Sequence, residues 1–456
     1  MKKSLFKSLI FTILSAFFLT FPVPVCAKSL SIPEDVHYIL IDSKTGLVMA
    51  EQNADIQIKP ASLTKILTAI VALENGDLQR EMTVSQAAVN DIGKGGMNIG
   101  IMAGETGLTL ENMLNVMLIK SANETANIIA ENLAPSRSEY MDMMNEKARE
   151  IGALNTYYVN PSGKDTEKED APHVTTARDM AVMARYAMTI PEFRKIVATE
   201  YYYGMPSSTN KHADGWDPLV LRNTNKFLWY DNTYNYTFEG DEREYTVTGI
   251  KTGYTGAAGN NLVISATGED GMELICVVMH VMHSNKVYSY ASELLDYGFQ
   301  NYSLKKVSNA GQLVKTVIVD GAAGDDNILE LVTEAGFEAV LPVGSDSQDI
   351  ETRVEIDSEI AAPVQKGKVL GYIEYMNSGT VLGKVNIVAA RQVLKSAEET
   401  LGITSALAEE QEPPYSYAIL AVLLALCAFV IIRSVLKKIS RNIKKKKYEQ
   451  EVYRSR

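Results

Sequence analysis

Cysteine and histidine are scarce: the 456 residues include 3 cysteines and 5 histidines. Cys26 and Cys427 lie in apolar terminal segments, which leaves Cys276 alone in the folded body. A lone cysteine cannot form a disulfide within that body, so disulfide-scaffold proteins are excluded and Cys276 is expected to be a small buried side chain. His280 and His283 share a predicted strand end, but a zinc site needs more ligands than the sequence offers beside them. We therefore expect neither a metal nor a cofactor.

Positive charge is scarce in the middle of the chain. Residues 28–432 hold 31 basic and 54 acidic residues, a net charge of −23, whereas the whole chain carries −12. A body this acidic is not expected to bind nucleic acid or an anionic surface. Because 46% of all residues are hydrophobic and 22% are charged, the chain can bury a core, which excludes the disordered and collagen-like classes.

The first apolar segment is typical of a signal peptide. Residues 1–27 start with Met1-Lys2-Lys3, continue as an apolar stretch and end at Val25-Cys26-Ala27, where the side chains suit a signal peptidase. Attachment of a lipid to Cys26 is the alternative, but Val23-Pro24-Val25 lacks the small residue expected before a lipid-bearing cysteine. The sequence therefore predicts that the body is exported.

The last apolar segment predicts a membrane anchor. Residues 418–432 are uninterrupted apolar and are followed by a basic cluster that includes Lys444–Lys447. Flanking tyrosines and a flanking arginine extend the segment to residues 417–436, about twenty residues, which is enough to span a bilayer. A buried core helix is the alternative, but the lysines directly after the run disfavour it. Residues 437–456 would then form a basic cytoplasmic tail, with the acidic body on the outer side of the cell membrane.

Apolar periods within the body predict an α+β fold. Alternating runs predict strands at 38–41, 47–49, 245–247, 262–266 and 272–279. Between them, helical spacing predicts helices that begin near Leu63, Leu110 and Glu124. Strands at both ends of residues 28–304, with helices between them, predict one antiparallel sheet flanked by helices.

The composition changes near Lys305. Short strand-like runs broken by glycine and aspartate fill the following residues, which predicts a small all-β domain at 305–397. Residues 398–416 are typical of a linker.

A serine and a lysine lie three residues apart at the start of the first strong helix. Ser-x-x-Lys occurs five times in the chain, but Ser62 and Lys65 are the pair at a predicted helix N-terminus, where backbone N–H groups stabilise negative charge on oxygen. The two side chains share one helix face. A lysine that is partly desolvated beside another cation can be neutral and accept the serine proton. Ser62 is therefore a candidate nucleophile and Lys65 its base.

A second motif, Ser121-Ala122-Asn123, lies on a predicted loop between two helices. The hydroxyl of Ser121 can relay a proton beside a lysine, and the carboxamide of Asn123 can hold a substrate amide by both its donor and its acceptor. Simple loop capping is the alternative, because serine and asparagine are common caps.

The third motif is Lys251-Thr252-Gly253, on a predicted strand. There Lys251 and the Thr252 hydroxyl can face a carboxylate, while Gly253 permits close approach of the backbone. The same tripeptide at Lys44–Gly46 lies in a hairpin turn and is interpreted as structural.

In this order, the three motifs resemble those of D-alanyl-D-alanine carboxypeptidases, which are low-molecular-mass penicillin-binding proteins of the serine class. Similar stretches are Pro60–Lys65, Ser121–Glu124, Asn160–Gly163, His173–Met180, Asn223–Asn225 and Gly249–Thr255. The resemblance covers about residues 30 to 300 and implies a β-lactamase/transpeptidase-like sheet flanked by helices. The small β domain and membrane attachment of that family fit the remainder.

The resemblance also implies roles for the motif residues. Ser62 would be the nucleophile and Lys65 the general base of acylation, with Ser121 and Lys251 as a proton relay to the leaving amine. His173 invites a triad interpretation, but with a lysine already beside the serine it is expected to be a structural hydrogen-bonding residue.

Substrate contacts are implied for the remaining motif residues. Asn123 would bind the substrate amide, and Thr252 beside Gly253 would meet the terminal carboxylate. The backbone N–H groups of Ser62 and Tyr254 would form the oxyanion hole.

The residue that clamps the substrate carboxylate stays open. Relatives often place an arginine after the Lys-Thr-Gly strand, whereas this chain has no arginine between Arg243 and Arg353. Lys286 or Lys251 are candidates for that task.

The sequence thus predicts a serine carboxypeptidase that removes the terminal D-Ala from peptidoglycan stem pentapeptides through an acyl-enzyme and is acylated by β-lactams. A β-lactamase is one alternative, although no convincing acidic residue for rapid deacylation is found. A non-hydrolytic, membrane-anchored penicillin-binding sensor or wall-binding protein is the other.

Overall fold

The computed structural model describes residues 30–396 except 94, 166–171, 215, 217–219, 230–244, 284–285, 324–326, 346–349 and 378, together with 422, 424, 426 and 429–438. The predicted signal peptide and linker, part of the predicted membrane anchor and most of the predicted tail lie outside these residues. Within the part of the chain that is described, residues 429–438 are helical, and no helix has the length and apolar character needed to cross a membrane.

The described residues form two compact units. The larger contains the chain up to Gln312 with Val332–Ile356 and Gly371–Ile387, and the smaller contains Leu313–Leu331, Asp357–Leu370 and the residues from Val388 on.

A five-stranded antiparallel sheet lies at the centre of the larger unit. Its strand order is β2(Val48–Gln52), β1(His37–Asp42), β7(Glu273–Val281), β6(Gly259–Gly268), β5(Tyr245–Thr255). The predicted N-terminal hairpin is β1 and β2, and the predicted later strands are β5 to β7. Strand β5 forms one edge of the sheet.

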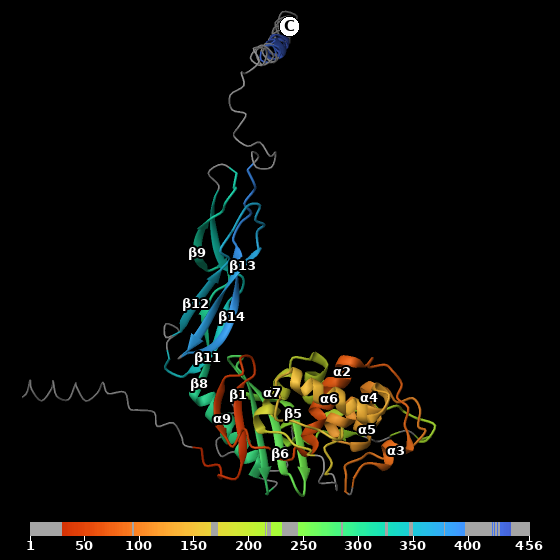
Figure 1. The fold of residues 1–456 in the computed structure, drawn as a ribbon. Coiled ribbons are helices and arrows are strands. Elements are labelled where there is room, and N and C mark those ends of the chain that lie inside the picture. Colours follow the sequence, from red (N-terminus) through yellow and green to blue (C-terminus); the bar gives the residue numbers. More distant parts are fainter. Residues whose placement is uncertain are drawn as a thin grey trace, which may run out of the picture. The chain divides into compact units, whose positions relative to one another are not determined.

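The sheet is buried on both faces (Figure 1). Alternate residues such as Ile39, Val263 and Val277 pack against the large helical layer, whereas Leu40 and Cys276 pack against α9(Lys286–Asn301) on the other face. Because side chains of a strand alternate between faces, continuous apolar runs are needed where helices cover both sides. Cys276 is buried as expected.

The helical layer follows the predicted order. Its helices are α2(Lys65–Asn75), α3(Gln86–Asn90), α4(Leu110–Asn115), α5(Asn123–Leu133), α6(Arg137–Glu150), α7(Ala177–Ala187) and α8(Pro191–Val197). Helix α4 starts at a capping box in which the Thr109 side chain accepts from the backbone of Asn112. Short turns η1(Ala61–Thr64), η2(Val116–Lys120) and η3(Lys226–Leu228) and the short pair β3(Tyr201–Tyr202), β4(Leu221–Arg222) complete it.

The described residues between Tyr302 and Ala389 are all-β, as the sequence predicts. Its strands are β8(Tyr302–Ser308), β9(Leu313–Ile318), β10(Ile328–Thr333), β11(Phe337–Pro342), β12(Glu351–Ile356), β13(Val369–Asn377) and β14(Thr380–Ala389). Strand β8 pairs with β11, and the others form a sheet in the order β12-β13-β14-β10-β9.

Candidate active site

The three sequence motifs meet in one cavity of about 1390 Å³. The η1 turn before α2, the start of α5 with the residues just before it, and strand β5 each contribute to its wall. The motif residues that line the cavity are Ser62, Ser121, Asn123, Thr252, Gly253 and Tyr254. Lys65 and Lys251 lie just beneath the cavity surface and are buried.

Ser62 lies in the η1 turn that leads directly into α2. The turn packs against edge strand β5 so closely that a Cβ added at Gly253 would be 3.1 Å from the carbonyl oxygen of Pro60 and 3.2 Å from the Ser62 nitrogen. The Asn261 side chain donates to the Pro60 carbonyl at 3.0 Å. The Ser62 hydroxyl is therefore held at a helix N-terminus, where the free N–H groups favour negative charge.

Lys65 is fully buried and contacts the Ser62 hydroxyl. Its Nζ lies 2.8 Å from Ser62 Oγ, 2.7 Å from Asn123 Oδ1 and 2.6 Å from the Ser162 carbonyl oxygen. Burial, followed by the nearby charge of Lys251, lowers the pKa of Lys65 well below that of an exposed lysine. A lysine in this setting can lose its proton and accept another from the serine.

Ser121 and Lys251 form the second serine–lysine pair. Ser121 ends the η2 turn in a left-handed conformation, with φ of 66°, and its Oγ accepts from Lys251 Nζ at 2.8 Å. Lys251 lies on β5, is only 1% exposed and also donates to the Thr252 carbonyl at 2.8 Å. Burial lowers the pKa of Lys251 to about 7. The Ser121 hydroxyl is thus linked to a group that can exchange a proton near neutral pH.

Asn123 is already engaged at both ends of its carboxamide. Its Oδ1 accepts from Lys65, and its Nδ2 donates to the Ile92 carbonyl at 2.7 Å. Its backbone N–H donates to the Met97 carbonyl at 2.7 Å. The second Nδ2 hydrogen can be donated to the carbonyl oxygen of a substrate. The predicted contact of Asn123 with substrate stays a prediction.

The edge strand supplies the outer wall of the cavity. Thr252 Oγ1 donates to Thr224 Oγ1 at 2.7 Å, which joins β5 to the Asn223–Asn225 loop, to which the sequence assigns no role. Tyr254 has an exposed side chain. An unpaired edge strand beside the Ser62 turn can accept an extended peptide by backbone hydrogen bonding.

The stretch Asn160–Gly163, to which the sequence assigns no role, forms a turn that contacts Lys65 and Ala61 behind Ser62. In Asn160–Gly163 the Asn160 side chain accepts from the backbone N–H of Gly163 at 2.8 Å, which fixes the turn whose Ser162 carbonyl contacts Lys65. Gly163 has φ of 79°, and an added Cβ would lie 1.8 Å from the Ala61 carbonyl oxygen. Only glycine fits there, and the Asn-Pro-Ser-Gly turn was the available signal.

His173 is a structural hydrogen-bonding residue, as expected. Its Nδ1 accepts from the backbone N–H of Val159 at 3.1 Å, so its Nε2 donates to Thr64 Oγ1, 2.9 Å away. Burial lowers the pKa of His173 to about 3, so the ring is neutral. Thr64 in turn donates to the Ala61 carbonyl at 2.9 Å, which braces the η1 turn.

The lysines that line the cavity are not Lys286 or Lys251, the two that the sequence suggests for binding the substrate carboxylate. Of the described residues that line the cavity, Lys164 and Lys226 are the basic ones, and Lys286 is not among them. Lys164 is ion-paired with Asp91. Lys226 lies two residues after Thr224, and burial lowers its pKa.

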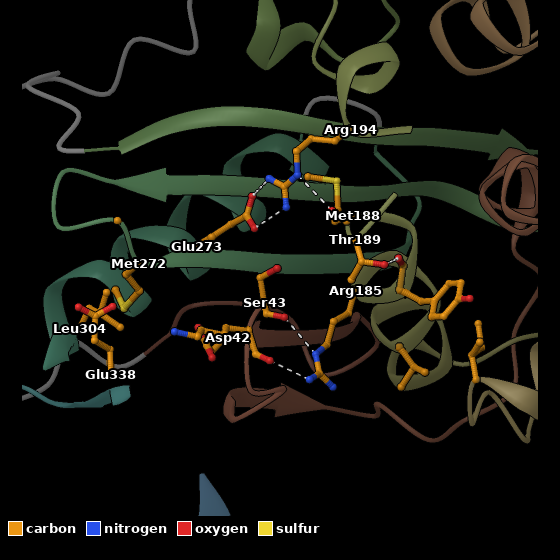
Figure 2. Close-up of a pocket in the computed structure, with 15 residues that line it drawn as sticks. Asp42, Ser43, Arg185, Met188, Thr189, Arg194, Met272, Glu273, Leu304 and Glu338 are labelled. Carbon is orange, nitrogen blue, oxygen red and sulfur yellow. Dashed lines mark hydrogen bonds and ion pairs between the residues drawn. The ribbon is translucent and has the colours of Figure 1, made fainter. Parts of the chain in front are cut away.

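A second cavity, of about 660 Å³, contains none of the motif residues (Figure 2). Arg194 pairs with Glu273 through two contacts of 2.5 and 3.0 Å, and Arg185 donates to the Ser43 and Lys44 carbonyls. Arg194 and Glu273 are bound to each other and Arg185 is bound to the backbone, so these groups carry no evident chemistry.

Two family models match the chain. The model described as D-alanyl-D-alanine carboxypeptidase matches residues 28–283, and the model described as penicillin-binding protein 5, C-terminal domain, matches residues 302–395. The first model alone covers more than half of the chain.

Individual relatives agree with this assignment. The chain is 29% identical to the D-alanyl-D-alanine carboxypeptidase DacF of Bacillus subtilis, over 79% of this chain and 85% of that protein. It is 28% identical to DacA of Escherichia coli, over 78% of this chain and 83% of that protein. The crystal structure of penicillin binding protein 5 from Haemophilus influenzae aligns with a TM-score of 0.60 at 26% identity, covering 80% of this chain and all of that one. The chain therefore belongs to the D-alanyl-D-alanine carboxypeptidase family, as a serine D-Ala-D-Ala carboxypeptidase of peptidoglycan and a penicillin-binding protein.

Proposed function

We propose that Ser62 is the nucleophile of this carboxypeptidase and that Lys65 is the base that activates it. The observation that carries the proposal is the 2.8 Å contact between Lys65 Nζ and Ser62 Oγ in a fully buried setting. Neutral Lys65 takes the hydroxyl proton while Ser62 Oγ attacks the carbonyl carbon of the D-Ala–D-Ala bond. The backbone N–H groups of Ser62 and Tyr254 receive the oxyanion that develops on the carbonyl oxygen.

The second serine–lysine pair then acts on the leaving group. A proton passes from Lys251 through the Ser121 hydroxyl to the amine nitrogen, the peptide bond breaks and the terminal D-Ala leaves. The 2.8 Å contact between Lys251 Nζ and Ser121 Oγ supports this path. Water subsequently attacks the ester on Ser62, which restores the hydroxyl and releases the peptide shortened by one residue. A β-lactam acylates the same serine.

The free carboxylate of the substrate is met by Thr252 and by Lys226. A carboxypeptidase needs a cation for the terminal carboxylate, and Lys226 lines the cavity two residues after Thr224. The contact of 2.7 Å between Thr252 Oγ1 and Thr224 Oγ1 brings the Thr224–Lys226 segment beside the Lys-Thr-Gly strand. Asn123 receives the substrate carbonyl through its second Nδ2 hydrogen, and Gly253 lets the peptide approach β5.

We further propose the location and division of the chain that the sequence indicates. Residues 1–27 would direct export, residues 28–304 catalysis, and residues 417–436 attachment to the cell membrane. The β-rich residues 305–397 and the linker 398–416 would connect catalysis to the anchor. Peptidoglycan stem peptides are then within reach on the outer side of the membrane.

Mass spectrometry of the penicillin-labelled protein tests the proposal. The adduct is expected on the peptide that contains Ser62, and the Ser62→Ala protein should neither form it nor release D-Ala from a pentapeptide. Ser208→Ala, in a Ser-x-x-Lys sequence outside the cavity, is the matched control and should behave as the unchanged protein. Release of D-Ala by folded Ser62→Ala would overturn the nucleophile assignment, and rapid loss of the penicilloyl adduct would favour a β-lactamase.

A further inference from the structure

One buried carboxylate at the active site has no part in the steps above. Glu124 follows Asn123 in the first turn of α5 and is only 1% exposed. Its Oε1 accepts from the backbone N–H of Ile99 at 2.7 Å. Its Oε2 is buried and has no hydrogen-bond partner among the described residues. A half-satisfied buried carboxylate is costly for the fold, so its position needs an explanation.

The first part of the explanation is the loop that forms one cavity wall. The described part of this glycine-rich loop lines the cavity from Asn90 to Met97. Asn123 holds its two ends through the Ile92 and Met97 carbonyls, and Glu124 holds the following turn through Ile99. Helix α5 thus anchors the loop by two consecutive side chains.

The second part is charge. Lys65 and Lys251 are two buried cations, and the charge of Lys251 makes Lys65 still easier to deprotonate. The charged groups that act on Lys65 come from two elements, Lys251 from β5 and Glu124 from α5, and the ring of His173 is neutral. Glu124 opposes burial and Lys251 by raising the pKa of Lys65. A general base works best when its pKa stays near the working pH, so unopposed lowering would weaken it.

We propose that Glu124 is a positioning residue of the active site, which anchors the glycine-rich loop through Ile99 and places one negative charge near Lys65. The inference rests on the proposed role of Lys65 as base. Glu124 touches neither substrate nor Ser62 in this role and acts through Lys65 and the loop.

The pH profile of acylation tests the charge. Glu124→Gln keeps the side-chain volume and an acceptor for Ile99 but removes the negative charge. In the pH–rate profile for acylation, the limb on the acid side is expected to move to lower pH by about one unit. The plateau rate should be reduced several-fold because the base is weaker. Glu124→Asp keeps the charge but is too short to reach Ile99, so it should lower the rate without moving the limb.

The control is Glu105→Gln. Glu105 is equally buried, accepts from Thr209 Oγ1 at 2.5 Å and does not line the cavity. Its pH profile should match that of the unchanged protein. The proposal is overturned if the profile of Glu124→Gln also matches, or if Glu124→Asp shifts the limb to the same extent. Neither result affects the adduct on Ser62, so failure here is distinguishable from failure of the proposed function.

Discussion

The two cavities of the larger unit handle charge in opposite ways. In the second cavity Arg194 and Glu273 neutralise each other, and the Arg194 side chain is 42% exposed (Figure 2). In the motif cavity Lys65 and Lys251 are at most 1% exposed, and among the described residues their ammonium groups contact hydroxyl, amide and carbonyl oxygens but no carboxylate. The first arrangement stabilises charge, whereas the second makes charge easy to remove.

The difference shows which cavity carries chemistry. Pairing with Glu273 raises the pKa of Arg194, which fixes its proton in place. Burial lowers the pKa of both active-site lysines, which prepares their protons for transfer. Size alone does not make this distinction, because both cavities could hold a small ligand.

The largest effect is expected from removing the base. Lys65→Met keeps the volume and length of the buried side chain but cannot accept the Ser62 proton. Acylation by penicillin should fall by about a hundredfold to ten-thousandfold, the usual contribution of general base catalysis. The rate is measured with a fluorescent penicillin. Because the variant removes a buried amine, its thermal midpoint should be equal to or above that of the unchanged protein.

The same substitution at a lysine of the second cavity is the control for Lys65→Met. Lys44→Met removes a lysine that lines that cavity and whose tripeptide has the same sequence as the third motif. Its acylation rate should not change. An unchanged acylation rate in Lys65→Met would contradict the claim that Lys65 in the motif cavity is the base.

The next effect is the loss of acylation at acid pH. A lysine is neutral above its pKa, so protonation of Lys65 on acidification removes the base, whereas Lys251 must be protonated to give a proton to the leaving nitrogen. The acylation rate should therefore fall about tenfold per pH unit below the lowered pKa of Lys65, and fall again above the pKa of Lys251, about 7. Rates of acylation between about pH 5 and pH 10 test this. A flat profile across neutrality would show that neither buried lysine takes part.

The same lysines link folding stability to pH. Between about pH 7 and the ordinary lysine pKa of roughly 10.4, the unfolded chain binds more protons at Lys251 than the folded protein does. The free energy of unfolding should therefore rise with pH across this window. Lys251→Met should flatten that rise in thermal melts recorded at several pH values, whereas Lys44→Met should leave it unchanged.

A smaller effect is expected from removing the cation that binds the terminal carboxylate of the substrate. Lys226→Met should raise KM for a pentapeptide by about tenfold to a hundredfold, because a charge-assisted hydrogen bond is lost. Lys164→Met is the control, since that ammonium is already paired with Asp91. Equal KM values for the two variants would contradict the assignment of Lys226 as the residue that binds the substrate carboxylate.

Local pattern was sufficient for much of the fold and for finding the three motifs that meet in one cavity. The apolar spacing after Leu63 predicts α2, and Thr109 marks the start of α4. Strand alternation predicts β5 to β7, and with them the position of Lys251. These features depend on neighbours within a few residues, which sequence displays directly.

Contacts across long sequence separations could not be predicted in the same way. The Ser162 carbonyl reaches Lys65 from 97 residues away, and Gly163 touches the carbonyl of Ala61. Lys226 lines the cavity in a segment that the contact of Thr224 with Thr252 joins to β5. No periodicity encodes such meetings, since they depend on how loops pack once the sheet and helices are formed.

The smallest effect is expected from breaking the ion pair of the second cavity. Arg194→Ala and Glu273→Ala should each lower the thermal midpoint by about 2–4 °C, the shift that roughly 1 kcal/mol gives in a domain of this size. The double variant should lose less than the sum, because each single change already removes the same two contacts. Acylation and D-Ala release should be unchanged in all three. A tenfold loss of activity without loss of stability would mean that this cavity also acts on substrate, which its mutually paired charges argue against.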